Sequence, residues 1–463
     1  MLTKIKETTK RTLISLFILM IGIFFKQIIN ILLVVSFILV NMFYINKYKL
    51  KLTLRIKRMI GLYFVFNYLL YFIFNDYRLV FYVSNFFLLY VSIIHYLSIF
   101  LENIIRGIYK KEAKKIIKNK RVIGITGSYG KTSSKNILYD MLSEIYSVSK
   151  TPKSFNTEIG IIKSIRENVS ELDEYFICEY GVDRVNGMDK LLSIVKPNIS
   201  LITEVGPQHL LTFKTIDNIR KEKIKLATCL NENEIAIINN DNEYLRISLK
   251  ELKCKYITYG IINDSDIMAK NIEVTKEGST FDLYINNKKI EKVKISLLGE
   301  HNISNVLGAI GVLYSLNIDE RRIIKLVSKI NQVEHRLQLK KINNISLIDD
   351  SFNSNVKGFK MAVDVLNMMK EKRIIITPGI IEQGSNSYSL NYEIAKYMSD
   401  KIDVAVLVEQ NSDILKQGLL DSGFSISNII IKKNFIEAWD FVKKIEGEKI
   451  VLIENDLPDI YLR

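Results

Sequence analysis

The residues of this chain best suited to chemistry lie in one short turn, Gly-Ser-Tyr-Gly-Lys-Thr, between an apolar run at 122–126 and a stretch from about Ser133 that predicts a helix. In such a turn the glycines let the backbone approach a phosphate, and the first N–H groups of the helix attract the anion. A lysine can reach the outer phosphates, and a threonine hydroxyl can bind Mg²⁺. The order strand, turn, helix therefore predicts a nucleotide site, although its spacing is shorter than Gly-x-x-x-x-Gly-Lys-[Ser/Thr]. Its candidate ligands are Gly127, Ser128, Gly130, Lys131 and Thr132.

Further polar side chains follow the strands expected after this turn. Tyr175–Glu179 is a buried-strand pattern that ends in an acid, and His209 follows a second apolar strand at 199–203. The stretch 217–230 has helical periodicity and carries Lys223. Strands that alternate with helices after a phosphate loop predict an α/β fold with a parallel sheet, whose ligands bind at the carboxyl ends of the strands.

The charge of the chain is very uneven along its length. Residues 1–121 hold 20 lysines and arginines against four acidic residues, whereas the rest of the chain holds 45 against 46. Nucleic-acid binding would need basic residues on the folded part, which is neutral, so this class of partner is excluded. Three scattered cysteines are too few for a disulfide framework or a zinc site.

The basic N-terminal region also contains four apolar runs, at 12–25, 28–45, 60–74 and 79–100. The second and fourth reach the length of a spanning helix. Basic residues precede the first run, separate the second from the third and follow the fourth, which predicts two helical hairpins with both termini in the cytoplasm. We therefore expect transmembrane helices within 1–120, a multi-pass cell-membrane location with the lipid bilayer as a partner, and cytoplasmic catalytic domains.

Several motifs occur in a familiar order along the chain. They are the segments 127–132, 156–160, 179–181, 299–305 and 349–355, together with Pro197, His209, Lys223 and Arg336. This set resembles the Mur ligase family, and within it the ligases that add D-alanyl-D-alanine to a UDP-N-acetylmuramoyl tripeptide. The resemblance covers about 121–440. It implies a central ATP-binding domain at 121–334 and a Rossmann-like C-terminal domain at 335–463.

The resemblance implies an ATP-dependent acid–amino acid ligase that forms C–N bonds and ADP. In this family ATP phosphorylates a carboxylate, and an amine then attacks the acyl phosphate to leave an amide and free phosphate. Two Mg²⁺ ions are implied, because the charge on the transferred phosphoryl group has to be neutralised. Thr132 and Glu179 would hold the first ion, and His209 with a carbamylated Lys223 would hold the second. The family usually has Glu two residues after that lysine, whereas this chain has Lys225.

Other site residues follow from the same resemblance. Lys131, Lys223, His209 and Arg336 would be catalytic, with Arg336 reaching the γ-phosphate. Nucleotide contacts are implied for Asn302, Asn305, Asp350 and Asn353, and substrate contacts for Asn156 and Thr157. Each also has a purely structural alternative: Glu179 as a solvated strand end, His209 as a loop histidine, Lys223 as an exposed helix charge, Asn302 as a helix N-cap and Asn353 as an Asx turn.

The substrates follow less directly from the sequence. Where the resembled ligases have Lys-Gly-Ser, this chain has an acidic segment with Glu454 and Asp456, which predicts an amine with more positive charge or no carboxylate. The usual uridine-binding domain has no counterpart, so we expect a lipid-linked muropeptide as the carboxylate substrate, confined near the enzyme by the bilayer. The predicted role is amide ligation in cell-wall peptidoglycan or envelope polymer synthesis. A poly-γ-glutamate synthase-like ligase and a non-catalytic nucleotide-binding scaffold remain alternatives.

Overall fold

The computed structural model describes residues 87–454 except 276, 334, 343, 352–355, 382–386 and 409–410, together with residues 58, 62, 65, 69, 72 and 73. Residues up to Ile108 form one unit and residues from Tyr109 onward form another. The sheets and the candidate site described below all belong to the second unit.

The helix α5, Phe87–Ile117, contains the described part of the apolar run 79–100. Charged residues enter the described part of this helix at Glu102 and recur at Arg106, Lys110 and Lys111. Among the described residues, no helix is long and apolar enough to cross a membrane. The prediction of transmembrane helices and of a multi-pass membrane location is therefore wrong for this part of the chain. The runs 12–25 and 28–45, and most of 60–74, lie outside the described residues.

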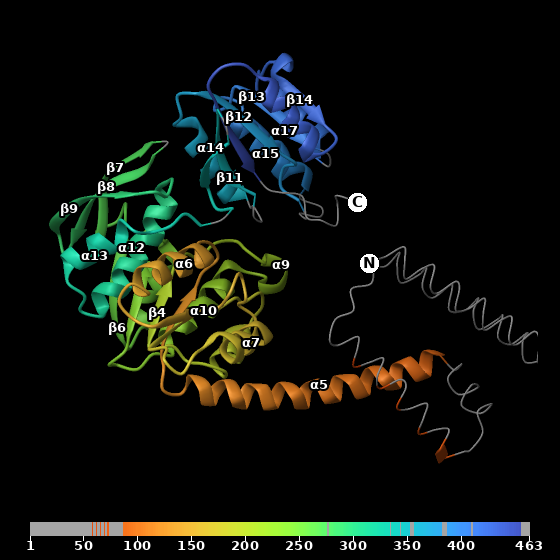
Figure 1. The fold of residues 1–463 in the computed structure, drawn as a ribbon, viewed down its shortest axis with the longest axis vertical. Helices are drawn as coiled ribbons and strands as arrows, with labels where there is room; N and C mark the ends of the chain where they lie inside the picture. Colours follow the sequence, from red (N-terminus) through yellow and green to blue (C-terminus); the bar gives the residue numbers. More distant parts are fainter. Residues whose placement is uncertain are drawn as a thin grey trace, which may run out of the picture. The chain divides into compact units, whose positions relative to one another are not determined.

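The first sheet of the second unit has nine strands among the described residues, in the order β2-β3-β1-β4-β5-β6-β7-β8-β9 (Figure 1). Neighbouring strands from β2 to β7 are parallel, and β7, β8 and β9 are antiparallel. The strands are Arg121–Thr126 (β1), Val148–Lys150 (β2), Tyr175–Glu179 (β3), Ile199–Ile202 (β4), Ile235–Asn239 (β5), Lys255–Gly260 (β6), Ile267–Thr275 (β7), Gly278–Ile285 (β8) and Lys288–Ile295 (β9).

Helices cover both faces of this sheet, which explains why its central strands are apolar throughout. In β1 the side chains of Ile123 and Ile125 pack in one hydrophobic cluster, and Val122 packs in the other. The helices of the first cluster are α6 (Lys131–Leu142), α12 (Glu300–Ser315) and α13 (Glu320–Val327). Those of the second are α7 (Glu158–Asn168), α8 (Gly187–Leu192), α10 (Ile216–Thr228) and α11 (Glu243–Ser248).

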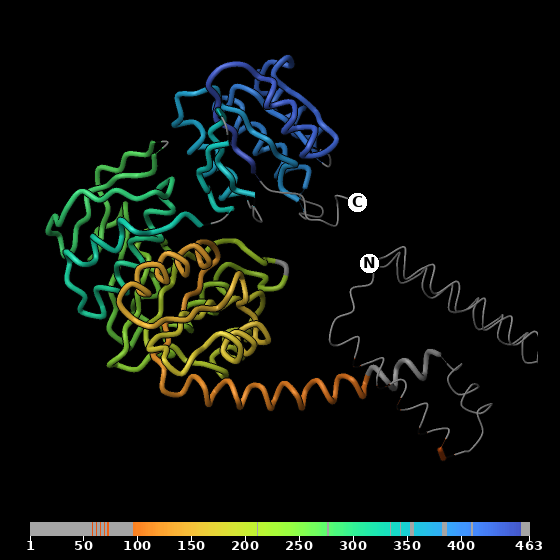
Figure 2. Tube along the Cα trace, in the orientation of Figure 1, coloured from red at the N-terminus to blue at the C-terminus, as the bar shows by residue number. Residues whose placement is uncertain are grey.

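The position of β1 decides where a ligand can bind. The chain runs from β1 to β2 and β3 on one side and then to β4 on the other side of β1, a path that the Cα trace follows (Figure 2). Such a reversal of strand order leaves a crevice at the carboxyl ends of the strands, which is where open α/β sheets bind ligands. The phosphate loop, Glu179 and Thr203 all lie at this edge.

The second sheet has the order β10-β11-β15-β12-β13-β14 in the described part of the chain. Its strands are Gln338–Ile342 (β10), Ile345–Asp350 (β11), Lys372–Thr377 (β12), Val404–Val408 (β13), Ile429–Lys432 (β14) and Lys449–Glu454 (β15), and only β10 runs antiparallel to its neighbour. The helices between them are α14 (Val356–Asn367), α15 (Ser387–Met398), α16 (Ser412–Asp421) and α17 (Phe435–Lys444). Because β15 is inserted between β11 and β12, the last residues of β11 and β15, Asp350 and Glu454, pair side by side.

The α/β part of the predicted fold agrees with these elements. The strand expected at Tyr175–Glu179 has the predicted bounds. Asn286 and Asn287 have positive φ angles of 48° and 64° between β8 and β9, as a tight hairpin turn requires. The division at 334 and 335 stays a prediction; it falls between α13 and β10.

Candidate active site

The phosphate loop joins β1 to α6 through two glycines that accept no side chain. Gly130 has a φ angle of 78°, and a Cβ there would lie 2.5 Å from Asn305 Oδ1. A Cβ at Gly127 would lie 1.9 Å from Thr203 Oγ1. Because the N-cap of α6 is Gly130 and no side chain caps this end, the first N–H groups of the helix are left for an anion.

Lys131 folds back over this loop. Its Nζ donates to the carbonyl oxygens of Gly127 and Ser128, at 2.6 and 3.0 Å. Burial lowers the pKa of Lys131 to about 8, against the opposing effect of Glu179 and with a further lowering by Arg336. The lysine is therefore held among the carbonyl groups of the turn in which we expect phosphates to bind.

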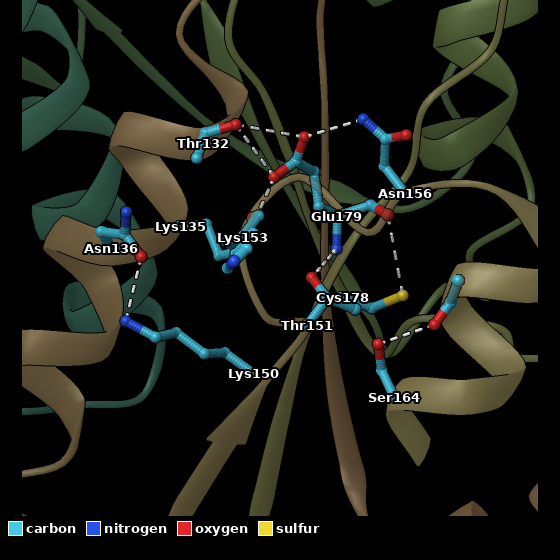
Figure 3. A network of polar contacts seen from close by, with 11 residues as sticks. Thr132, Lys135, Asn136, Lys150, Thr151, Lys153, Asn156, Ser164, Cys178 and Glu179 are labelled. Atoms are coloured by element: carbon cyan, nitrogen blue, oxygen red, sulfur yellow. Dashed lines mark hydrogen bonds and ion pairs between the residues drawn. The ribbon is translucent and has the colours of Figure 1, made fainter. Parts of the chain in front are cut away.

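Glu179 is the centre of a polar network at the carboxyl end of β3 (Figure 3). Its carboxylate accepts from Thr132 Oγ1 at 3.1 and 3.3 Å and from Asn156 Nδ2 at 3.0 Å. Lys135 Nζ lies 2.9 Å from Oε2, and both side chains of this ion pair are 1% exposed. The alternative of a solvated acid at a strand end is therefore wrong.

A Mg²⁺ ion fits the Thr132–Glu179 arrangement. This ion takes few protein ligands and completes its shell with water and substrate phosphates, so one carboxylate and one hydroxyl beside a phosphate loop are suitable donors. In the part of the chain that the structure describes, no group of three or more His, Cys, Asp or Glu side chains forms a metal cluster. The residues thus suit an ion shared with a nucleotide rather than an ion bound by protein alone.

The segment that follows β4 holds the phosphate loop in place by hydrogen bonds. Ser128 donates its N–H to the carbonyl of Glu204 at 2.6 Å, and its hydroxyl exchanges hydrogen bonds of 3.0 Å with Gly206. Thr203 Oγ1 donates to the carbonyl of Tyr129 at 2.5 Å. These contacts fix the loop without using the N–H groups at the start of α6.

Lys223 reaches the same loop from α10. Its Nζ donates to the carbonyl of Gly127 at 2.9 Å, and the side chain is 2% exposed, so the alternative of an exposed helix charge is wrong. Burial and the neighbouring Lys131 hold its pKa well below the usual range. A lowered pKa favours the neutral amine, which is the form that could be carbamylated; the structure contains an unmodified lysine.

His209 lies near Lys223 at the start of the short helix α9, Leu210–Phe213. It has a φ angle of 57°, which is uncommon for a residue with a side chain. Burial and Lys223 lower its pKa, while Asp183 opposes this effect. The structure thus brings His209 into the electrostatic environment of Lys223, as the second metal site would require.

Lys225, which stands where the family usually has Glu, faces another way. Its Nζ lies 2.6 Å from Asp189 and 3.2 Å from Glu222. Glu222 is 2% exposed and also accepts from the N–H groups of Asn186 and Met188, at 2.9 Å each. This carboxylate therefore secures the start of α8, and the second metal site has no acidic ligand at position 225.

Asn302 and Asn305, the two asparagines of α12, make different contacts. Asn305 Oδ1 accepts from Ser134 Oγ at 3.0 Å and packs against the phosphate loop. Asn302 is buried and donates to the carbonyl of Leu298 at 2.9 Å. The N-cap of this helix is Gly299, so the alternative reading of Asn302 as an N-cap is wrong.

A second group of charges lies at the ends of β11 and β15. Burial raises the pKa of Asp350 to about 6, against the opposing effects of Arg336 and of a hydrogen bond with Glu454. Arg336 is itself buried, which lowers its pKa, and Asp350, Glu179 and Glu454 oppose that shift. Glu454 has no exposed surface and lies beside Asp350, with which it is paired in the sheet.

Two of the predicted substrate residues lie before α7. Asn156 contacts Glu179, whereas Thr157 caps α7 by accepting from the N–H of Gly160 at 3.4 Å. The predicted positions Asn353 and Asp456 lie outside the described residues. Lys135 was missed by sequence reasoning, because a spacing of four residues from Lys131 places it on the same face of the helix but does not show that it is buried.

Two family models match the chain, the Mur ligase middle domain over residues 125–313 and the Mur ligase, glutamate ligase domain over 335–454. The UDP-N-acetylmuramoyl-tripeptide--D-alanyl-D-alanine ligase of Haemophilus influenzae is 30% identical over 345 residues, which cover 73% of this chain and 71% of the relative. The enzyme of the same name from Buchnera aphidicola subsp. Baizongia pistaciae is 32% identical, and the alignment covers 58% of each chain. The chain thus spans between about half and three quarters of these relatives.

Solved structures share the fold. MurF from Acinetobacter baumannii superposes with a TM-score of 0.67 at 21% identity, over 76% of this chain and 77% of that chain. The MurF ligase from Thermotoga maritima in complex with ADP gives a TM-score of 0.66 at 22% identity, over 76% and 80%.

Proposed function

This chain belongs to the Mur ligase family of ATP-dependent, ADP-forming amide ligases, and we propose that it joins a carboxylate-bearing peptide to an amino acid or dipeptide in peptidoglycan synthesis. The observation that carries the proposal is the contact between Thr132 and Glu179 beside a phosphate loop whose helix end is uncapped. That arrangement suits a nucleotide phosphate together with its magnesium ion.

The charged residues have complementary tasks in this proposal. Thr132 and Glu179 would hold Mg²⁺, which when bound neutralises charge on the phosphoryl group. Lys131 and Arg336 add positive charge where phosphoryl transfer to the carboxylate develops negative charge. Asn305 packs against Gly130, and Asn302, Asp350 and Asn353 are proposed nucleotide contacts.

We also propose that Lys223 is used as a carbamate, with His209 as its neighbour. A lowered pKa favours the neutral amine, which is the form that can attack CO₂. The resulting carbamate is an anionic oxygen ligand, which suits a second Mg²⁺ ion better than an ammonium group. Because position 225 is a lysine paired elsewhere, water or substrate oxygens would complete that site.

The acyl substrate is proposed from the relatives, which are named for a UDP-N-acetylmuramoyl tripeptide and D-alanyl-D-alanine. The expected lipid-linked muropeptide also depended on predicted membrane helices, which the described residues do not contain. For the amine, we propose that Glu454 and Asp456 favour a more positively charged group than the dipeptide. If Glu454→Lys and Asp456→Ala leave the ranking of amines unchanged, this part of the proposal fails.

Purified protein with ATP and MgCl₂ tests the function directly. The expected result is phosphate release that requires both a UDP-muramoyl tripeptide and an amine, with a product mass equal to the two joined minus water. Lys131→Met is the inactive control. Phosphate release with glutamate alone, and products of many residues, would overturn the proposal in favour of a poly-γ-glutamate ligase; no release with any carboxylate would reject both.

A further inference from the structure

Lys135 occupies an unusual position for a lysine. It lies in the second turn of α6, it has no exposed surface, and its Nζ pairs with Glu179 Oε2 at 2.9 Å. The same Nζ donates to the backbone carbonyl of Lys153 (Figure 3). A buried ammonium group is strongly unfavourable unless all its partners are in place, so these two contacts are closely defined.

The carbonyl that Lys135 contacts belongs to a strained turn. Lys153 has a φ angle of 46°, a left-handed conformation that costs a residue with a side chain about 1 kcal/mol or more. The turn, 151–157, is fixed at its ends: Thr151 Oγ1 accepts from the N–H of Glu179 at 3.2 Å, and Asn156 donates to the carboxylate of Glu179. The middle of the turn, at Lys153 and Ser154, is exposed, and Lys135 contacts it through the carbonyl of Lys153.

Three elements thus meet at one ammonium group. α6 carries the phosphate loop, β3 carries Glu179, and the turn 151–157 carries the proposed substrate residues Asn156 and Thr157. Thr132, one helical turn before Lys135, contacts the same carboxylate. Any change in the orientation of Glu179 when Mg²⁺ and nucleotide bind is therefore transmitted to Lys135 and to the carbonyl of Lys153.

We propose that Lys135 is a positioning residue that couples occupation of the nucleotide site to the conformation of the turn 151–157. It acts through Glu179 and the carbonyl of Lys153 and does not itself contact substrate. The inference rests on the proposed nucleotide function of the Thr132–Glu179 pair. It adds to that function a route from the nucleotide site to the turn 151–157, which carries the proposed substrate residues.

Hydrogen–deuterium exchange of the full chain, with and without ADP and MgCl₂, tests this coupling without any acyl substrate. In the wild type we expect added protection at 127–134 and also at 153–155. In Lys135→Met we expect protection at 127–134 to persist, while exchange at 153–155 becomes at least tenfold faster and no longer responds to Mg·ADP.

The matched control is Lys150→Met. Lys150 lies in the same polar network, and replacing it removes the same charge. Its Nζ donates to Asn136 Oδ1 at 2.9 Å and does not contact Glu179 or Lys153 (Figure 3). The Lys150→Met protein should keep the wild-type change in exchange at 153–155 when Mg·ADP is added. A response retained in Lys135→Met overturns the inference, as does equal loss in both variants.

The wild type alone separates the two proposals if Lys135→Met does not fold. No protection at 127–134 on adding Mg·ADP contradicts the nucleotide function and, with it, the coupling. Protection at 127–134 without any change at 153–155 leaves the function intact and overturns the coupling.

Discussion

Lys131 and Lys223 donate to the same backbone oxygen, the carbonyl of Gly127, at 2.6 and 2.9 Å. Two amino groups on one acceptor repel each other when both are charged. Burial lowers the pKa of Lys131 to about 8 and holds the pKa of Lys223 well below its usual range. Both effects favour loss of a proton from this pair, and each lysine gives a prediction of its own.

The first prediction concerns the pH dependence of nucleotide binding through Lys131. Binding of a phosphate favours the protonated lysine, and the free protein loses that proton as the pH rises through about 8. The affinity for ADP should be nearly constant below pH 7 and should fall by up to about tenfold per pH unit above pH 8. Titration of a fluorescent ADP analogue between pH 6 and 9.5 measures this. Lys131→Arg, which does not titrate, should show no such fall; a wild type that also shows none would contradict the assignment.

The second prediction concerns Lys223 as a carbamate. Because its lowered pKa leaves a neutral amine, ¹³C-bicarbonate should give a carbamate signal in the ¹³C NMR spectrum of the wild type near pH 8. Lys223→Met should lack the signal. Lys221→Met, which removes an exposed lysine of the same helix that pairs with Asp217, should retain it. Equal signals in all three proteins would reject the assignment.

A third prediction separates metal binding from nucleotide binding at Glu179. Glu179→Gln keeps the size of the side chain but removes its charge, so the gain in ADP affinity on adding MgCl₂ should shrink by about 10- to 100-fold. ADP binding without magnesium should change much less. Isothermal titration with and without EDTA distinguishes the two. A Glu179→Gln protein that retains the full magnesium effect would place the ion elsewhere.

The fourth prediction uses two glycines with nearly the same backbone conformation. Gly130 and Gly423 have φ angles of 78° and 82°, but a Cβ at Gly130 meets Asn305 Oδ1 at 2.5 Å, whereas a Cβ at Gly423 has nothing within 4 Å. Gly423→Ala should lose about 1 kcal/mol of unfolding free energy from backbone strain alone. Gly130→Ala should lose about 2–3 kcal/mol and most of its ADP affinity, because the clash displaces the loop. Urea unfolding and ADP titration measure both; equal losses would mean that Asn305 simply moves aside.

The fifth prediction concerns stability and Asp350. Its pKa in the folded protein is raised to about 6 from a usual value of 3.8, so the charged carboxylate is the less stable form there, and the folded protein gains stability as protons bind between pH 6 and 4. Asp350→Asn should therefore raise the unfolding free energy at pH 7.5 by about 3 kcal/mol and by much less at pH 4. Chemical unfolding at the two pH values checks this. A loss at pH 7.5 would show that pairing with Arg336 outweighs burial.

The strand ends of the site could be predicted from the sequence because they follow local rules. An apolar run that ends in an acid indicates a buried strand with its acid at the ligand edge, and Glu179 lies there. Lys135 could not be found in this way, since a lysine in a predicted helix is usually exposed. Its burial depends on the turn at Lys153 and on Glu179, both distant in the sequence.

The membrane prediction is wrong for the described residues, among which no helix is long and apolar enough to cross a bilayer. The prediction used the apolar run 79–100, and α5 continues beyond this run to Ile117 through Glu102 and Arg106. Hydropathy within a chosen window does not show where a helix ends. Position 225 is a similar case. The sequence shows that Lys225 departs from the family pattern, but it does not show that Lys225 pairs with Asp189 and Glu222.

The contacts of Lys131 bear on which nucleotides we expect the protein to bind. Its side chain is partly buried, and the two carbonyl oxygens replace part of the hydration of the amino group. A ligand that offers this lysine a cluster of phosphate oxygens gains an ion pair with a cation that is already partly dehydrated. We therefore expect adenosine, which carries no phosphate, to bind far more weakly than the polyphosphates.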